Sequence, residues 1–128
     1  MILLDTSVLI DALTGPRRSA AALRAAIEQG ERIQLPTLVL FEWLRGDRLH
    51  AELEAQEALF PREAGVAFGA EEAARAAELY RDVKRPRGRE IDLAIAACAL
   101  CADAELWTLH VDDFADVPGL RVRRPETS

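Results

Sequence analysis

The sequence is poor in aromatic residues, in lysine and in long apolar runs. Aromatic side chains make up 5% of its 128 residues, and Lys84 is the single lysine. Alanine and leucine carry most of the apolar content instead, which favours helices. No apolar run is long enough to span a bilayer, and no basic segment precedes the first one as it does in a signal peptide. We therefore expect a cytoplasmic protein that does not enter a membrane.

Cysteine is also scarce. Cys98 and Cys101 are the two cysteines, spaced C-x-x-C within the apolar run IDLAIAACALCADA. There is no second cysteine pair, and the next histidine is His110, so we interpret both as free thiols on a buried helix rather than as a redox or zinc site. A chain of this length can fold without disulfides, and we expect residues 1–128 to form a single domain.

Positive charge is outweighed by negative charge, and the formal net charge is −6 at pH 7. This argues against a protein that coats nucleic acid nonspecifically, since such a protein is basic. It does not exclude a nuclease that gathers acids around metal ions and bases elsewhere. Nearly all the cations are arginines, which reflects either a compositional bias or bidentate recognition of phosphates.

Short apolar segments with strand and helix patterns alternate along the chain. Strands are predicted at 2–5, 32–35, 65–68, 105–109 and 120–124. Helices are predicted at 7–13, 17–29, 37–46, 47–60, 70–85 and 90–102, with Thr6 or Ser7 and Thr37 as candidate capping residues. Such alternation is typical of a parallel sheet with helices on both faces. Ligands of these sheets bind outside the carboxyl ends of the strands.

Four acidic residues occupy positions where a carboxylate is unexpected. Asp5 ends the first predicted strand, and Asp113 follows the strand at 105–109. Glu42 lies in TLVLFEWLRG, which is apolar on nearly all sides and is therefore predicted to be buried. Asp92 lies in the first turn of the apolar helix at 90–102. A buried carboxylate must be paired or must bind a metal ion.

Each acid also has an ordinary explanation: a helix cap, an ion pair, compensation of the helix dipole or a turn. Asp5 could cap a helix, and Glu42 could pair with Arg45 or Arg48. Asp92 could compensate the helix dipole, and Asp113 could be a turn residue. Brought together, however, the four carboxylates would repel one another, and at least one pKa would rise. A hard divalent cation relieves that repulsion. The residues therefore predict a Mg²⁺ or Mn²⁺ site of the kind that acts on phosphates.

Four segments resemble, in order and spacing, those of the PIN-domain ribonucleases. They are LLDTSVLIDAL, LFEWLRG, DLAIAACAL and TLHVDDFADVPGLRV. The similarity covers essentially the whole chain and is closest to the VapC-type toxins of toxin–antitoxin pairs. It implies a PIN-like three-layer α/β/α sandwich with a mostly parallel sheet. It also implies a Mg²⁺- or Mn²⁺-dependent endoribonuclease that hydrolyses RNA phosphodiester bonds, forms a homodimer and is inhibited by a cognate antitoxin protein.

The resemblance further implies roles for individual residues. The metal-binding and catalytic acids would be Asp5, Glu42, Asp92 and Asp113, with Ser7, Thr108 and Asp112 in supporting positions. Either Asp112 or Asp113 could face the metal, and Asp113 is preferred because its spacing to Phe114 matches. The chain departs from the family at His110, where an asparagine is usual.

RNA that approaches an acidic pocket needs local positive charge to guide it. The candidates are Arg45, Arg85, Arg87 and Arg89. A solvated helix end and surface salt bridges explain these arginines equally well.

Three other functions are compatible with parts of the sequence. A PIN-like regulatory domain would bind RNA or protein without cleaving, but it would need an incomplete set of acids. A phosphatase with Asp5 as nucleophile would need a second aspartate where Ser7 stands. An adhesion-type metal domain with the motif D-x-S-x-S would need a serine in place of Leu9.

Overall fold

The structure, a computed structural model, describes residues 1–126. Within that range a single sheet has the strand order β2-β1-β3-β4, and every neighbouring pair is parallel. The strands are β1 (Ile2–Leu4), β2 (Ile33–Gln34), β3 (Glu105–Trp107) and β4 (Val122–Arg123). The predicted α/β fold with a parallel sheet is confirmed, although each strand is shorter than its sequence pattern indicated.

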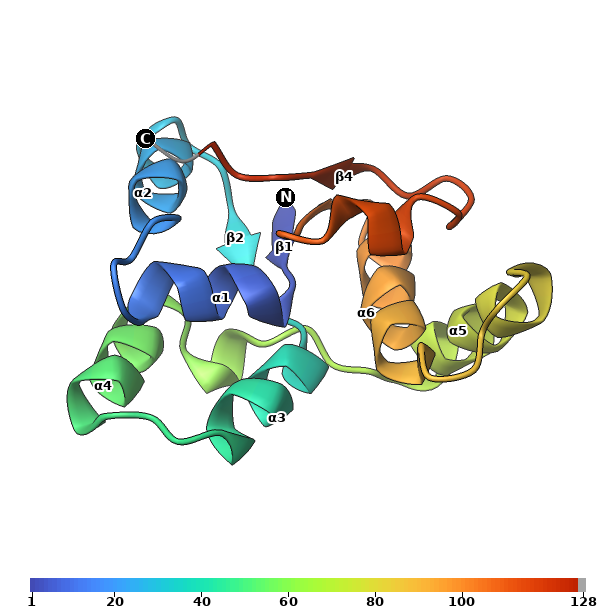
Figure 1. Ribbon diagram of the computed structural model, residues 1–128, viewed down its shortest axis with the longest axis horizontal. Helices are drawn as coiled ribbons and strands as arrows, with labels where there is room; N and C mark the ends of the chain where they lie inside the picture. Colours follow the sequence, from blue (N-terminus) through green and yellow to red (C-terminus); the bar gives the residue numbers. More distant parts are fainter. Residues whose placement is uncertain (127–128) are drawn as a thin grey trace.

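Helices connect the strands and cover the sheet on two sides. They are α1 (Thr6–Leu13), α2 (Ala20–Glu28), α3 (Thr37–Arg45), α4 (His50–Leu59), α5 (Ala70–Asp82) and α6 (Glu90–Cys101). In Figure 1, α5 and α6 lie together at the right of the view, while α1 to α4 lie at the left and below. None of the helices in residues 1–126 combines the length and apolar character needed to cross a bilayer.

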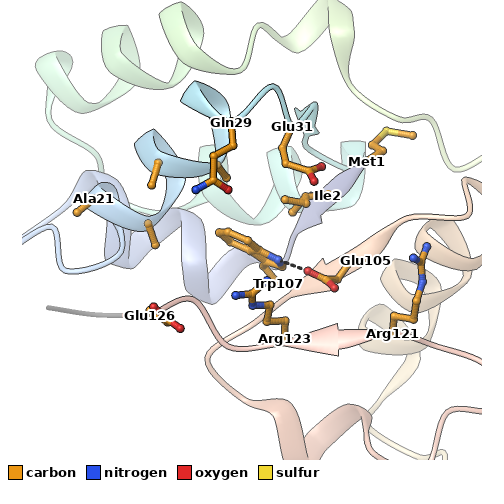
Figure 2. Close-up of a pocket in the computed structure, with 13 residues that line it drawn as sticks. Met1, Ile2, Ala21, Gln29, Glu31, Glu105, Trp107, Arg121, Arg123 and Glu126 are labelled. Atoms are coloured by element: carbon orange, nitrogen blue, oxygen red, sulfur yellow. Dashed lines mark hydrogen bonds between the residues drawn. The ribbon is translucent and has the colours of Figure 1, made fainter.

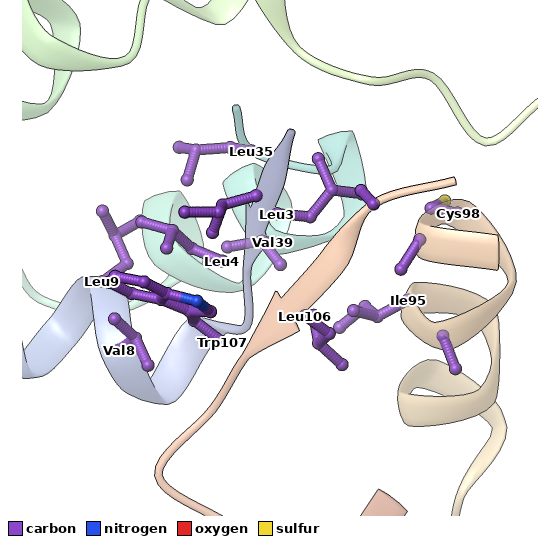
Figure 3. Packing of buried hydrophobic residues seen from close by; sticks show 14 of the residues in the cluster. Leu3, Leu4, Val8, Leu9, Leu35, Val39, Ile95, Cys98, Leu106 and Trp107 are labelled. Atoms are coloured by element: carbon purple, nitrogen blue, oxygen red, sulfur yellow. The ribbon is translucent and has the colours of Figure 1, made fainter. Parts of the chain in front are cut away.

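Successive residues of the central strands point to opposite faces of the sheet. Leu106 points toward Ile95 of α6, whereas Trp107 lies beside Leu9 of α1 (Figure 3). Leu4 pairs in register with Trp107, and both are buried. Strands that are covered on both faces have continuous apolar runs, which explains the unbroken sequence Ile2–Leu4.

Helix α6 forms much of the layer on one face of the sheet. Residues 93–99 are buried without interruption, as expected of a helix that is apolar on all sides. Cys98 is buried and Cys101 half-buried, and both are free thiols, as predicted. Burial raises the pKa of the Cys98 thiol to about 11, so this cysteine is a packing residue rather than a nucleophile.

Some local predictions are wrong. The predicted strand at 65–68 is reduced to one parallel bridge between Val66 and Pro36, because the segment that contains Pro36 enters α3 at Thr37. The N-cap residues of α1 and α3 are Asp5 and Pro36, neither of which makes a side-chain capping hydrogen bond. The hydroxyl groups of Thr6 and Ser7 are bonded instead to acidic side chains.

Candidate active site

Asp5 follows β1 directly and lies at the carboxyl end of the sheet. Its backbone N–H donates to the Trp107 carbonyl at 2.9 Å, which continues the pairing of β1 with β3. The residue is 6% exposed. Its Oδ2 atom accepts hydrogen bonds from Ser7 Oγ at 3.0 Å and from Thr108 Oγ1 at 2.7 Å. These two donors fix the direction of the carboxylate.

Ser7 and Thr108 are held in turn by the backbone that follows β3. The Leu109 N–H donates to Ser7 Oγ at 3.1 Å, and the His110 N–H donates to Thr108 Oγ1 at 3.0 Å. Thr108 is completely buried. The two hydroxyl groups therefore connect the end of β3 with the carboxylate at the end of β1, while the exposed His110 contributes its backbone to this network.

Glu42 reaches the same region from α3. Its side chain is 21% exposed, so the prediction that it is buried is wrong. The Oε1 atom accepts a hydrogen bond from Thr6 Oγ1 at 2.6 Å, and Oε2 lies 3.4 Å from a guanidinium nitrogen of Arg45. Helix α3 has an exposed face as well as a buried one, because Phe41 is 54% and Leu44 42% exposed.

Asp92 is the acid on which the charges of the other three act. It lies in the first turn of α6 and is half-buried. Burial raises the pKa of its carboxyl group, and the charges of Asp5, Glu42 and Asp113 raise the pKa further, while Arg89 lowers it. This agrees with the expected effect of bringing the carboxylates together.

Asp112 and Asp113 differ in their relation to this group of acids. Both are exposed in the short 3-10 helix η2 (Val111–Phe114), which is anchored by the buried Phe114. The charge of Asp113 is among those that raise the pKa of Asp92, and that of Asp112 is not. The charge of Asp113 thus acts on Asp92, which is consistent with the preference for Asp113 and leaves that assignment a prediction.

The chemistry of these residues suits a hard cation, but the site is not a finished coordination shell. Across residues 1–126, no three His, Cys, Asp or Glu side chains lie close enough together to hold a metal ion. The four side chains offer carboxylate oxygens alone, which are the donors that Mg²⁺ and Mn²⁺ prefer. The structure therefore brings the acids into electrostatic contact without bringing three of them to the spacing of metal ligands.

The four candidate RNA-binding arginines have different surroundings. Arg45 is paired with Glu42 and lies over the Phe41 ring, 5.1 Å from its centroid. Arg85 and Arg87 are exposed, and neither forms an ion pair within the part of the chain that is described. The Arg89 side chain is 22% exposed and is paired with Asp116.

Two residues of the site were missed by sequence reasoning. Thr6 was considered only as a helix cap, and its bond to Glu42 spans 36 residues. Asp116 received no role, and its partner Arg89 is 27 residues away. Pairs so far apart leave no periodic signal in a single sequence, so only the folded chain identifies them.

A cavity of about 520 Å³ lies away from these acids. It is bounded by α2 and by side chains of β1, β3 and β4, including Trp107, whose Nε1 donates to Glu105 Oε1 at 2.6 Å (Figure 2). Met1 and Ile2 line it, so the cavity reaches the amino end of β1, whereas Asp5 lies beyond its carboxyl end. None of the predicted site residues lines this cavity.

Comparison with known proteins shows which family this chain belongs to. The PIN domain family matches residues 2–120. Ribonuclease VapC19 of Mycobacterium tuberculosis is 36% identical over 124 residues, which cover 94% of this chain and 98% of that protein.

Two solved structures have a similar fold. VapBC2 from Rickettsia felis, bound to a DNA fragment from its promoter, matches with a TM-score of 0.79 and 20% identity over 98% of this chain and 100% of that chain. A toxin–antitoxin complex from Klebsiella pneumoniae matches with a TM-score of 0.75 and 26% identity over 100% of both chains. The family match, the sequence identity to the mycobacterial ribonuclease and the shared fold together show that this chain belongs to the PIN domain family.

Proposed function

We propose that this chain is a Mg²⁺- or Mn²⁺-dependent endoribonuclease and the toxin of a type II toxin–antitoxin pair. The observation that carries the proposal is the placement of Asp5 at the carboxyl edge of the sheet, held by Ser7 and Thr108. Glu42, Asp92 and Asp113 come close enough for the charges of Asp5, Glu42 and Asp113 to act on Asp92. Membership in the PIN domain family and the identity to a protein named Ribonuclease VapC19 support hydrolysis of RNA.

In this proposal the acidic residues bind the cation, and the hydroxyl groups orient the acidic side chains. Asp5, Asp92 and Asp113 would hold the cation, and Glu42 would complete the set or orient the attacking water. A bound divalent ion supplies a water of lowered pKa and stabilises charge on the scissile phosphate. Ser7 and Thr108 keep Oδ2 of Asp5 in place, Thr6 does the same for Oε1 of Glu42, and Asp112 stands beside Asp113.

The route of the RNA follows from the exposed cations. Arg85 and Arg87 lie in the segment before α6 and are exposed, so they offer positive charge to solvent in the segment that leads to Asp92. Arg45 lies on α3 and forms an ion pair with Glu42, which partly neutralises its charge. We assign phosphate contacts to Arg85 and Arg87 first, and to Arg45 second.

An antitoxin protein is the proposed partner. The structural relatives include VapBC and other toxin–antitoxin complexes, which supports this assignment. Phe41 and Leu44 expose apolar surface on α3 on both sides of Glu42 in the sequence, where a bound partner would also cover the acids. A homodimer, a location in the cytoplasm and a single PIN domain over residues 1–128 complete the proposal.

Cleavage of labelled RNA tests the proposed activity. The wild-type chain should cleave with Mn²⁺ and lose activity with EDTA. Asp5→Asn and Glu42→Gln keep the side-chain shapes but remove a charge, and each should lower the cleavage rate about 100-fold or more, since even outer residues of metal sites matter about 10–100-fold. Asp82→Asn, on the exposed end of α5, is the matched control and should cleave normally.

Equal cleavage by wild type and Asp5→Asn would indicate a contaminating nuclease and would contradict the proposal. Activity that persists in EDTA would contradict the role of the metal.

A further inference from the structure

Arg89 joins the two segments that carry Asp92 and Asp113. Its Nη1 and Nη2 atoms donate to the two carboxylate oxygens of Asp116 at 2.9 and 2.7 Å. Nη2 also donates to the Asp113 carbonyl at 2.9 Å, and Nη1 to the Arg85 carbonyl at 3.4 Å. A single guanidinium group therefore makes four hydrogen bonds, three of them to the acidic segment after β3.

The bidentate pair of Arg89 with Asp116 is a strong interaction for side chains near the surface. A bidentate pair between arginine and a carboxylate is charge-assisted and fixes the relative orientation of both groups. The hydrogen bond to Asp116 is the largest cause of the raised pKa of Arg89, and the same bond is the largest cause of the lowered pKa of Asp116. The side chain of Arg89 is 22% exposed, which limits competition from water.

The backbone of Arg89 is fixed just as closely. Arg89 is the N-cap residue of α6, and its carbonyl accepts the Leu93 N–H at 2.8 Å. Asp92 is three residues further along the same first turn. On the other side, Asp116 follows the buried Phe114 by two residues, and Asp113 precedes it by one. The arginine thus bridges the first turn of α6 and the segment that contains η2.

We propose that Arg89 and Asp116 form a clamp that keeps Asp113 beside Asp92. We call the four hydrogen bonds of the Arg89 side chain the Arg89 clamp. Arg89 acts through Asp113 and touches neither RNA nor metal, which makes it a positioning residue. The inference rests on the proposed function, because Asp92 and Asp113 are taken to bind the cation together.

The clamp replaces the expectation that Arg89 binds RNA. The Nη1 and Nη2 atoms of arginine carry four N–H groups, and each of these nitrogens already makes two hydrogen bonds within the protein. The charge is also balanced by Asp116. A phosphate could bind Arg89 in the same way only by displacing these partners, whereas Arg85 and Arg87 are exposed without an ion pair in residues 1–126.

The test compares Mn²⁺ binding with RNA binding in the full chain. The variants are Arg89→Gln, Arg89→Lys, Asp116→Asn and the double variant Arg89→Gln with Asp116→Asn. Arg75→Gln and Glu78→Gln are matched controls, because this pair on α5 has a similar separation of 2.9 Å. Free Mn²⁺ is followed by its electron paramagnetic resonance signal, and RNA binding is measured in EDTA at several salt concentrations.

The clamp predicts that Asp116→Asn and Arg89→Gln each weaken Mn²⁺ binding about tenfold or more, as residues that orient metal ligands do. The double variant should bind Mn²⁺ no more weakly than the single variant with the lower Mn²⁺ affinity, since both changes disrupt the same group of hydrogen bonds. Arg89→Lys should not restore binding, because an ammonium cannot make the bidentate pair and reach the carbonyl groups together. Amide hydrogen exchange of residues 110–117 should accelerate in Asp116→Asn.

An RNA contact predicts a different pattern. Asp116→Asn would then leave Mn²⁺ affinity unchanged and would strengthen RNA binding by freeing Arg89, and Arg89→Gln would reduce the salt dependence of RNA binding by about one unit of slope. That result would overturn the clamp. Asp116 is about half-exposed, so Asp116→Asn remains informative even where Arg89→Gln unfolds.

The proposed function and the clamp fail in distinguishable ways. A wild-type chain that binds no Mn²⁺, with the same result for Asp5→Asn, would overturn the proposed function and the clamp with it. Normal Mn²⁺ binding in the wild type together with normal binding in Asp116→Asn and Arg89→Gln would overturn the clamp alone.

Discussion

Hydroxyl groups hold the acidic side chains of this site in place. Thr108 and Ser7 both donate to one oxygen of Asp5, and Thr6 donates to one oxygen of Glu42. A hydrogen bond to a charged group contributes about 1.5–3 kcal/mol, which is enough to hold a side chain in one orientation. The Oδ1 atom of Asp5 takes no part in these bonds and is held in a fixed direction by them, whereas the second oxygen of Glu42 faces Arg45.

Asp92 gives a prediction for the pH dependence of stability. Its pKa in the folded protein is raised by burial and by Asp5, Glu42 and Asp113, with Arg89 acting in the opposite direction. The charged form is therefore disfavoured in the folded state, and the protein is destabilised at pH values above the folded pKa. Asp92→Asn should raise the free energy of unfolding of the metal-free protein at neutral pH. The gain should fade as the pH drops through the folded pKa toward 3.8.

Urea unfolding of wild type and Asp92→Asn in EDTA between pH 3.5 and 8 measures this difference. A constant difference across the whole range, or a loss of stability at neutral pH, would contradict the prediction. The same variant should lose cleavage activity, which separates its effect on stability from its effect on catalysis.

Several residue roles were accessible from the sequence. Asp5 and Asp92 stand out as acids within apolar runs, and the resemblance to PIN-domain ribonucleases implied support from Ser7 and Thr108. The catalytic assignments stay predictions. Asp116 was not accessible, because nothing in the local pattern after Phe114 indicates a partner 27 residues away.

At the scale of elements, the turn before α6 controls where the Arg89 clamp begins. Gly88 has a φ of 82°, and its N–H donates to Glu90 Oε1 at 2.7 Å. A Cβ there would meet nothing within 4 Å, so a substitution would be opposed by backbone conformation alone. Gly30 after α2 has a φ of 87° and equally open surroundings, which makes it a matched control.

Gly88→Ala and Gly30→Ala should each destabilise the protein by about 1–2 kcal/mol, the usual cost of a left-handed conformation for a residue with a Cβ. Only Gly88→Ala should also weaken Mn²⁺ binding and cleavage, because it disturbs the residue before Arg89. Thermal unfolding and Mn²⁺ titration of both variants provide the comparison. Equal effects of the two variants on Mn²⁺ binding would contradict this role of the turn.

Elements were predicted unequally well. The helix at 90–102 was recognised from its continuous apolar sequence, and the structure ends it within one residue of that prediction. The predicted helix at 17–29 instead begins at Ala20, since Arg17 has a φ of 55° that no helix allows. The strand expected at 65–68 failed because a strand needs a partner, and the partner ends at Pro36.

At the scale of the whole molecule, sheet topology assembles the site. β1 lies between β2 and β3, so the segments that follow β1 and β3 emerge side by side at one edge. Helix α3 contacts both α1 and α6, which brings Glu42 and Asp92 toward Asp5. Parallel strands have their carboxyl ends at the same edge, and this is why acids from distant parts of the chain meet.

A divalent cation should stabilise the folded protein, because it relieves repulsion among acids that come together only in the native state. Binding at a hundred times the dissociation constant adds about 2.7 kcal/mol to the free energy of unfolding. The melting temperature of the wild type should therefore rise with Mn²⁺, and that of Asp5→Asn should rise less. Differential scanning calorimetry at matched ionic strength checks this. No rise under conditions where Mn²⁺ binding is seen independently would contradict a shared metal site.

By itself, the sequence determined the alternation of helices with parallel strands and the presence of acids at positions that apolar residues would otherwise occupy. Both can be inferred from local patterns, because hydrophobic periodicity and the ends of strands depend on residues that are close together in the sequence. Only the folded chain shows that Arg89 bonds Asp116, that α3 keeps an exposed apolar face and that Thr6 bonds Glu42. These depend on distances between segments far apart in the chain, which are set by the packing of the whole molecule.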